Sequence, residues 1–299
     1  MEKLELKVLD GETLKGFSWN LPHPKGHVVI FEGMEEHVSR YGGLAKFLNE
    51  HGYSVHGLDT YGQGENVYRD LANIGMWPVD GFSKQITAHH MLVESLKKDG
   101  LPVYVFAHSM GAFMGQGYIQ MYPGEVNKIV LCGSGAKNPG VALITPLAKL
   151  FIRGKKRDKK AKLLNSIMFG NFNKKIKKPR TAYDWLSHNE GEVDKYIKDP
   201  LCGFGPRNGF CLEFLKGMNE LYKKKNLSRV NKDTNIFLIA GSEDPVTNYG
   251  KFPAVLTKMY CKYGVNNVTS EVFNGLRHEL INEDRRNEVY ESVLNFFEK

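Results

Sequence analysis

The 299-residue sequence has little cysteine and no long apolar run. Its cysteines form neither a CxxC pair nor a cysteine–histidine spacing typical of a metal site; they are Cys132, Cys202, Cys211 and Cys261. No segment approaches the roughly 18 consecutive apolar residues of a transmembrane helix, and the N-terminal segment has no apolar core typical of a secretion signal. These absences predict a cytoplasmic protein with reduced thiols and with no metal or cofactor.

The segment 138–232 is short of acidic residues. It contains 22 Lys and Arg but 8 Asp and Glu, a local charge of +14, whereas the rest of the chain has a charge of −6. This uneven distribution predicts that 138–232 is an insertion, and that residues 1–137 and 233–299 form the main fold.

The stretch VYVFAHSMGAF, residues 103–113, combines an apolar run, a sharp turn and the start of a helix. Its β-branched and aromatic residues favour a strand that is buried on both faces. Ser109 lies in the turn, with the small residues Ala107 and Gly111 two positions to either side, an arrangement typical of the nucleophile elbow. A serine in such a turn projects toward a base and can act as a nucleophile. The alternative is an ordinary turn whose serine caps the helix.

The rest of the sequence alternates strands with helices. Strands are expected at residues 4–9, 14–19, 27–31, 53–58, 103–106, 128–132, 236–240 and 270–273. The first two form a hairpin that turns at Asp10-Gly11. Helices are expected around 44–48 and at 83–98, 111–121, 252–263 and 286–297. This alternation predicts a mostly parallel sheet in an α/β fold.

Separated motifs carry a resemblance to a known family. They are GMEEHVSRY (33–41), LDTYGQG (58–64), AHSMGA (107–112), and the pair GSEDPV (241–246) and RHELINE (277–283). Together they resemble the α/β-hydrolase fold and, within it, the monoacylglycerol lipase and lysophospholipase group, which includes serine aminopeptidase-like members. The resemblance implies a mostly parallel eight-stranded sheet with helices on both faces. It also implies a helical cap or lid at 138–232, inserted into a hydrolase core of 1–137 and 233–299.

The resemblance implies a catalytic triad. An activated serine needs a histidine base and a carboxylate that orients the base, and in this fold the order along the chain is serine, acid, histidine. Ser109 is then the nucleophile and His278 the base. The match to the family's motif favours Asp244 as the acid, with Glu243 as its rival. His108, beside the nucleophile, is expected to be structural.

Acyl transfer also needs two N–H donors for the oxyanion. One is the backbone of Met110, the residue after the nucleophile, and the resemblance implies that the other is Met34. The family's loop usually begins His-Gly, whereas here Glu32 takes the place of that histidine. Because an unpaired carboxylate is unfavourable beside an oxyanion hole, we expect Glu32 to pair with Arg40 or Arg277.

These residues predict a serine hydrolase that cleaves carboxylic esters of the monoacylglycerol or lysophospholipid type through an acyl-enzyme. One alternative is an aminopeptidase or amidase on the same triad, whose substrate amine is held by acidic residues of the cap, Glu190, Glu192, Asp194 and Asp199. Another is a non-catalytic lipid-binding protein on the same fold, which the complete triad disfavours. A nucleotide site at Gly62-Gln63-Gly64 is also disfavoured, because this turn lacks a third glycine and a following lysine.

The sequence of the expected cap, 138–232, predicts a contact with membranes. Its apolar segment 141–152 adjoins a basic run, 153–162, and a second basic run follows at 174–180. Apolar area and cations together suit an anionic lipid surface, so we expect peripheral binding to anionic membranes. The positive charge is also compatible with nucleic acid, but the chain has no recognisable nucleic-acid-binding module and no such partner is expected.

Overall fold

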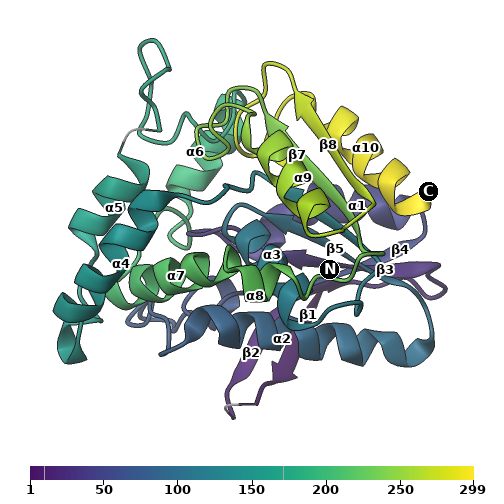
Figure 1. Cartoon of the computed structure of the whole chain (residues 1–299), viewed down its shortest axis with the longest axis horizontal. Coiled ribbons are helices and arrows are strands. Elements are labelled where there is room, and N and C mark those ends of the chain that lie inside the picture. Colours follow the sequence, from purple (N-terminus) through teal and green to yellow (C-terminus); the bar gives the residue numbers. More distant parts are fainter. Residues whose placement is uncertain (10, 171) are drawn as a thin grey trace.

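The computed structural model describes residues 1–9, 11–170 and 172–299, which fold around one twisted sheet (Figure 1). The sheet has eight strands in the order β1-β2-β4-β3-β5-β6-β7-β8. They are β1 (Glu2–Lys7), β2 (Thr13–Trp19), β3 (Gly26–Phe31), β4 (Tyr53–Leu58), β5 (Val103–His108), β6 (Lys128–Cys132), β7 (Asn235–Gly241) and β8 (Val268–Phe273). Each strand predicted from the sequence is present.

The sheet is antiparallel at one edge and parallel elsewhere. β1 and β2 form a hairpin, β2 also runs antiparallel to β4, and every neighbouring pair from β4 across to β8 is parallel. The central strands are almost entirely buried, as expected for parallel strands that helices cover on both faces. The hairpin turn was predicted at Asp10-Gly11; Asp10 lies outside the described residues, and Gly11 has a φ of +87°, which suits glycine.

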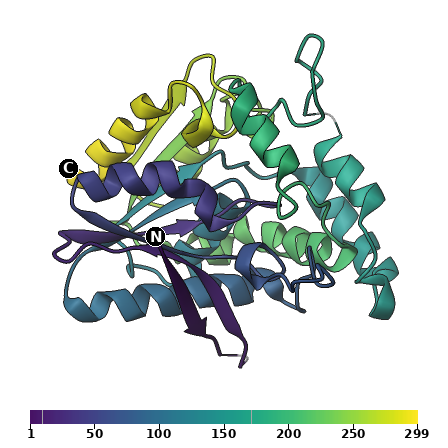
Figure 2. The same cartoon turned by 180° about the vertical axis from the view of Figure 1, so that it is seen from behind.

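Helices cover both faces of the sheet (Figure 2). On one face lie α1 (Gly42–Glu50) and α10 (Arg286–Glu298), which pack on the sheet through a shared hydrophobic cluster. On the other face lie α2 (Gly81–Leu96), α3 (Met110–Met121) and α9 (Phe252–Lys262), which bury a second cluster. This arrangement leaves the carboxyl ends of the parallel strands, where the loops carry the predicted site residues, open to the inserted segment.

The segment between β6 and β7 forms a helical layer at that end of the sheet (Figure 1). Its helices are α4 (Pro139–Phe151), α5 (Lys162–Phe169), α6 (Glu190–Lys198), α7 (Asn208–Leu221) and α8 (Lys224–Leu227). α7 has two buried faces: Phe210 and Phe214 join the core cluster, whereas Leu212 and Leu215 pack with α4 and α5. The division into a core and a cap at 138–232 stays a prediction, with α7 as the helix that both parts share.

In the described part of the chain, no helix combines the length and the apolar character that crossing a membrane requires.

Candidate active site

The turn between β5 and α3 holds Ser109 in a strained backbone conformation. Ser109 has φ 52° and ψ −117°, a combination that residues other than glycine seldom adopt. Its N–H donates to the carbonyl of Cys132 on β6 (2.9 Å). Its side chain does not cap α3, and Oγ instead contacts His278. The alternative of a helix-capping serine is therefore wrong, and the strain is typical of a nucleophile elbow.

Small residues around this turn let α3 approach the sheet closely. A Cβ at Gly111 would lie 2.0 Å from the carbonyl oxygen of Phe31, at the end of β3. A Cβ at Gly115, one turn further along α3, would lie 3.1 Å from the Cβ of Ala107 on β5. The N-terminus of α3 is thereby held against β3 and β5, directly behind Ser109.

Side chains from three separate loops meet at this end of the sheet. Oγ of Ser109 lies 2.9 Å from Nε2 of His278, and Nδ1 of His278 lies 3.0 Å from Oδ1 of Asp244. The second contact has the distance of an ion pair, but the N–H direction is poorly aligned, and Nδ1 has no better partner among the described residues. Oδ1 of Asp244 also accepts the N–H of Val246 (2.8 Å). Serine, histidine and acid thus form a continuous chain of contacts.

Glu243, the rival acid, turns toward a different histidine. Its Oε2 lies 3.2 Å from Nε2 of His188 and 3.9 Å from Nε of Arg277. The Glu243 side chain is half exposed, whereas that of Asp244 is fully buried against His278. The geometry therefore favours Asp244 as the partner of His278.

The loop after β3, residues 32–37 and called here the β3 loop, brings Met34 to the same place. Met34 and Ser109 line the same two cavities, and Met110 lines one of them. Among the described residues, neither the Met34 N–H nor the Met110 N–H has a hydrogen-bond acceptor. Free N–H groups at a helix N-terminus and in an adjacent loop suit a developing oxyanion, so both predicted donors lie beside the nucleophile.

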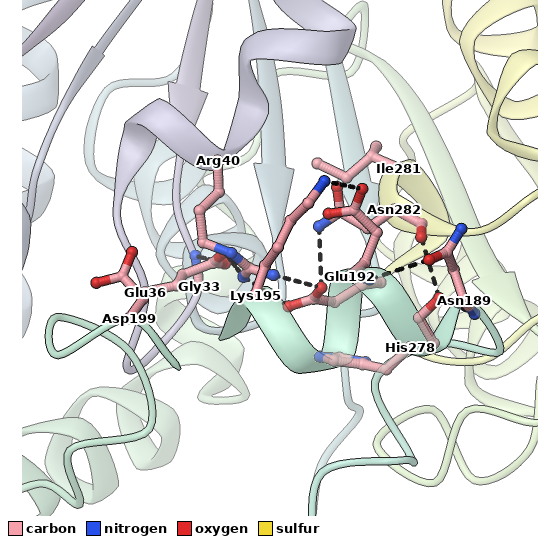
Figure 3. A network of polar contacts seen from close by, with 12 residues as sticks. Gly33, Glu36, Arg40, Asn189, Glu192, Lys195, Asp199, His278, Ile281 and Asn282 are labelled. Atoms are coloured by element: carbon pink, nitrogen blue, oxygen red, sulfur yellow. Dashed lines mark hydrogen bonds and ion pairs between the residues drawn. The ribbon is translucent and has the colours of Figure 1, made fainter. Parts of the chain in front are cut away.

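Arg40 connects the β3 loop to the segment that carries His278. Its guanidinium donates to Oε2 of Glu36 (2.6 Å) and makes two bonds of 2.7 Å to the carboxylate of Glu279. Figure 3 shows this network, with Glu36 on one side and His278 on the other. Burial opposes the ionisation of Glu36, but Arg40 and His108 lower its pKa well below the usual range. The Glu36–Arg40 pair is therefore ionic at neutral pH.

Glu32 pairs with neither of the arginines that we expected. It is fully buried, and its Oε1 accepts a backbone N–H (2.7 Å) and the side-chain amide of Gln63 (2.9 Å). Burial and the nearby charge of Asp59 raise the pKa of Glu32 well above its usual range. The expected pairing with Arg40 or Arg277 is wrong because a neutral carboxyl requires no cation.

Two cavities of different character meet at Ser109. The apolar cavity, of about 470 Å³, is walled by α4, α5 and α7 and includes Phe113, Val141, Ile144, Met168, Phe214 and Phe252. The second cavity, of about 320 Å³, has the larger polar share of the two, from Glu35, Asn165, Ser166, Asn173 and Tyr183, although apolar surface still forms most of its wall; it is called here the polar cavity. Ser109, Met34 and Trp185 line both. The serine therefore stands at the junction of an apolar and a polar compartment.

The acidic residues proposed to hold a substrate amine are paired with basic side chains. The pairs are Asp194–Arg180 (2.7 Å), Glu190–Arg180 (3.8 Å), Glu192–Lys195 (2.9 Å) and Asp199–His37 (2.9 Å). None of these four carboxylates lines either cavity at Ser109. The acidic patch that an aminopeptidase would need does not form from them.

One group of metal-ligating residues comes together that the sequence spacing did not reveal. The ligand atoms of His37, Asp199 and Cys202 lie within 4.8 Å of one another. Both nitrogens of His37 are already engaged, with Ser39 (2.8 Å) and Asp199 (2.9 Å). Burial raises the pKa of the Cys202 thiol well above its usual range, which opposes the thiolate form that a metal binds. The group ties the β3 loop to the cap.

Comparison with known proteins assigns the family. Residues 22–285 match the family described as serine aminopeptidase, S33. The chain belongs to this family of hydrolases. The match spans β3 to the start of α10 and therefore includes the loops that carry Ser109, Asp244 and His278.

Individual relatives are lipases and an esterase. A monoglyceride lipase homolog of Monkeypox virus is 23% identical over 294 residues, 97% of this chain and 94% of that one. A monoacylglycerol lipase of Mycolicibacterium smegmatis is 24% identical over 281 residues, 91% and 88% of the two chains. A thermostable carboxyl esterase from Bacillus coagulans, solved with glycerol, has a TM-score of 0.91 and 27% identity over 99% and 97% of the chains. These matches confirm the predicted family and fold, and they agree with the predicted carboxylic-ester hydrolase.

Proposed function

We propose that this protein hydrolyses monoacylglycerols through an acyl-enzyme formed on Ser109. Oγ attacks the ester carbonyl while Nε2 of His278 takes its proton, and Asp244 keeps the imidazole oriented. The N–H groups of Met34 and Met110 donate to the oxyanion. His278 then gives its proton to the leaving glycerol oxygen, and a water molecule repeats the attack to release the fatty acid.

The observation that carries this proposal is the position of Ser109 between the two cavities. A monoacylglycerol has the same division, with an acyl chain on one side of the ester carbon and a diol on the other. The apolar cavity of about 470 Å³ has the size and lining of a small-molecule site, and the polar cavity offers hydrogen-bonding groups. An ester carbonyl at Ser109 would place the chain in the first and the glycerol in the second.

The charges of the polar cavity favour an uncharged headgroup. Its charged lining includes Glu35, Glu36 and Glu279 but no Lys or Arg among the described residues. Arg40 forms salt bridges with two of these carboxylates, and burial raises the pKa of the third, Glu35. A phosphate group would find no lysine or arginine in the described lining, and His108, whose pKa is raised by Glu36, is already paired with that carboxylate (3.2 Å), whereas a hydroxyl would find acceptors. We therefore favour monoacylglycerols over lysophospholipids.

An orphaned polar atom supports the same choice. Oδ1 of Asn165 is buried in the wall of the polar cavity and has no hydrogen-bond partner among the described residues. A buried acceptor without a donor costs about 1–3 kcal/mol. If the Asn165 amide turned toward the cavity, a glycerol hydroxyl would supply the missing donor.

A substrate panel tests the proposal. The kcat/KM values are measured for a monoacylglycerol, a lysophosphatidylcholine, a lysophosphatidic acid and an aminoacyl arylamide of matched chain or size. We expect the monoacylglycerol to exceed both phospholipids by about tenfold or more, since each 1.4 kcal/mol of unfavourable headgroup desolvation is a factor of about ten. Faster turnover of either lysophospholipid, or arylamide cleavage without ester cleavage, would overturn the assignment.

The outer surface of the cap supports a second proposal, that the protein works as a cytoplasmic enzyme that binds membranes peripherally. α4 and α5 expose a set of large apolar side chains, each 56–76% accessible: Leu143, Leu147, Leu150, Phe151, Leu163 and Ile167. Exposed lysines lie near them in the sequence, namely Lys149, Lys155, Lys156, Lys159 and Lys162. Together they form what we call the α4–α5 surface. Apolar insertion and cationic contacts reinforce each other at an anionic lipid surface.

The basic run 153–162 is not uniformly available for this contact. Arg157 binds Oε1 of the buried Glu213 (2.9 Å), and Lys160 donates to the carbonyls of Phe204 and Gly205. These two cations hold the cap together, so the membrane-facing charge comes from their exposed neighbours. Sedimentation with vesicles should show stronger binding to anionic than to neutral lipid, weakened by salt; equal binding to both, or none, would refute the contact.

A further inference from the structure

The side chain of Gln63 makes three hydrogen bonds to the β3 loop. Gln63 lies in the turn after β4 and is fully buried. Its Nε2 donates to the carbonyl of Gly33 (3.0 Å) and to Oε1 of Glu32 (2.9 Å). Its Oε1 accepts the N–H of Glu35 (2.7 Å). One amide therefore binds the residues on both sides of Met34.

The bond to Gly33 determines where the Met34 N–H points. The Gly33 carbonyl and the Met34 N–H belong to one planar trans peptide, so they point in opposite directions. Because Gln63 draws the carbonyl toward itself, the N–H is directed away from Gln63. Met34 lines the cavities that contain Ser109. Rotation of this peptide would break the Gln63 bond and remove the N–H from its place.

The orientation of the Gln63 amide is itself fixed. The Glu35 N–H can only donate and the Gly33 carbonyl can only accept, so the oxygen and nitrogen of the amide cannot exchange places. Glu32 adds a second acceptor for Nε2, and its Oε1 is held in turn by the N–H of Thr60 (2.7 Å). The two residues that set this geometry, Glu32 and Gln63, come from loops after neighbouring strands.

We propose that Gln63 is a positioning residue that holds the Gly33–Met34 peptide in the orientation needed to stabilise the oxyanion. This inference rests on the proposed serine hydrolase function, in which the Met34 N–H is one of two donors. Loss of one oxyanion donor typically lowers kcat by about 10²–10³-fold. Gln63 does not touch the substrate, so its effect is expected on the transition state and not on ground-state binding.

The test compares Gln63→Met with a matched substitution, Gln120→Met. Methionine has the length of glutamine but makes none of the three bonds. Gln120 is a second buried glutamine, on α3, which donates to the carbonyl of Leu221 (3.0 Å). For a short soluble ester we expect Gln63→Met to lower kcat by about 10²-fold with KM changed only a few-fold. We expect Gln120→Met to leave both within a few-fold of wild type.

The affinity of a tetrahedral inhibitor distinguishes a positioning role of Gln63 from a purely structural one. A purely structural role would leave this affinity unchanged. A boronic acid that bonds to Ser109 mimics the oxyanion intermediate, so its affinity should fall in parallel with kcat in Gln63→Met and stay unchanged in Gln120→Met. Equal kcat in the two variants, or a loss confined to KM with unchanged boronate affinity, would overturn the inference. A wild type that hydrolyses no ester would instead refute the proposed function.

A second variant keeps the test valid if Gln63→Met does not fold. Gln63→Glu retains the acceptor for the Glu35 N–H, and its carboxyl donates to Gly33 only while protonated. The titratable and charged groups that face this region include Glu32, Glu35, Glu36, His37, Arg40, Tyr41, Asp59 and His108. We expect kcat of Gln63→Glu relative to wild type to fall as pH rises and the new carboxyl ionises. A ratio that stays at one across the pH range would overturn the inference.

Discussion

The core and the cap place polar and apolar groups in opposite ways. Around the β3 loop of the core, Glu32, Glu36 and Gln63 are buried and hydrogen-bonded. On the cap, large apolar side chains such as Leu143 and Leu163 stand at the surface, 76% and 73% exposed. Buried polar groups are costly unless paired, and large exposed apolar patches mark interaction sites. The contrast agrees with the proposals that residues of the core fix the reaction geometry and that the cap contacts lipid.

The two regions are nevertheless joined at the histidine. The N–H of Glu279 donates to the carbonyl of Leu186 in the cap (2.7 Å), and that of His278 donates to the carbonyl of Trp185 (3.4 Å). The Trp185 ring lies 5.1 Å from the imidazole of His278. Substitutions can therefore separate the roles of core and cap only if they leave the contacts of His278 and Glu279 with residues 185–186 intact.

The largest expected effect belongs to the nucleophile in the core. Ser109→Ala should abolish labelling by a fluorophosphonate probe and lower kcat by roughly 10⁴-fold or more, because no other group forms the acyl-enzyme. Mass spectrometry of the labelled wild type identifies the modified residue. A label on a different serine would show that the triad has been assigned to the wrong residues.

The acid of the triad comes next. Asp244→Asn should leave the fold intact and lower kcat by about 10³–10⁴-fold, because the amide no longer holds His278 in the required tautomer. Glu243→Gln is the control: this side chain is half exposed and contacts His188, so kcat should stay within a few-fold of wild type. Near-normal kcat for Asp244→Asn, or a large loss for Glu243→Gln, would reverse the choice of acid.

The predicted fold is confirmed because local patterns determine it, and the same patterns place the three proposed triad residues at one end of the sheet. Apolar runs and their flanking turns locate every strand, and β4 and β6 have the predicted ends. Each proposed triad residue lies in a loop after a parallel strand, at the same end of the sheet: Ser109, Asp244 and His278. The sheet topology therefore brings them together. The backbone strain at Ser109 likewise follows from the short turn between a strand and a helix.

Pairings between distant charged residues were not predictable from local patterns. Arg40 and Glu279 are 239 positions apart, and nothing in either segment indicates that they meet. The pairing expected for Glu32 was wrong for a related reason. The burial of Glu32, which raises its pKa and keeps it neutral, depends on how the β3 loop packs and cannot be predicted from local sequence. The pairing of Arg157 in the basic run 153–162 with the buried Glu213, 56 positions away, was not predictable from the sequence either.

The cap should show effects on vesicles and none on soluble substrate. Replacing Lys155, Lys156 and Lys159 by Gln removes charges worth about 1 kcal/mol each near an anionic membrane, so vesicle binding should weaken roughly 10- to 100-fold. Turnover of a short soluble ester should not change. The control replaces the exposed core lysines Lys7, Lys98 and Lys258 by Gln, with the same loss of net charge. Equal loss of binding in both triple variants would mean that net charge, and not the α4–α5 surface, drives the contact.

The smallest expected effect is on stability, and it differs between a buried carboxyl of the core, Glu32, and one of the cap, Glu213. Glu32 is held neutral by burial and by Asp59, whereas Glu213 makes salt bridges with Arg157 (2.9 Å) and Lys216 (2.5 Å). Below the unfolded pKa of Glu32, near 4.3, both states carry its proton and stability is unaffected. Above it, the unfolded state releases the proton while the folded state retains it, so wild-type stability falls as pH rises.

Glutamine at position 32 has no proton to lose. It can still accept from Gln63 and can donate to Asp59, so Glu32→Gln should raise the urea midpoint relative to wild type by an amount that grows from pH 5 to pH 9. Glu213→Gln should lower the midpoint at every pH in this range, because it leaves two cations without their buried partner. A Glu32→Gln difference that is independent of pH, or that turns destabilising at pH 9, would mean that Glu32 is ionised in the folded protein.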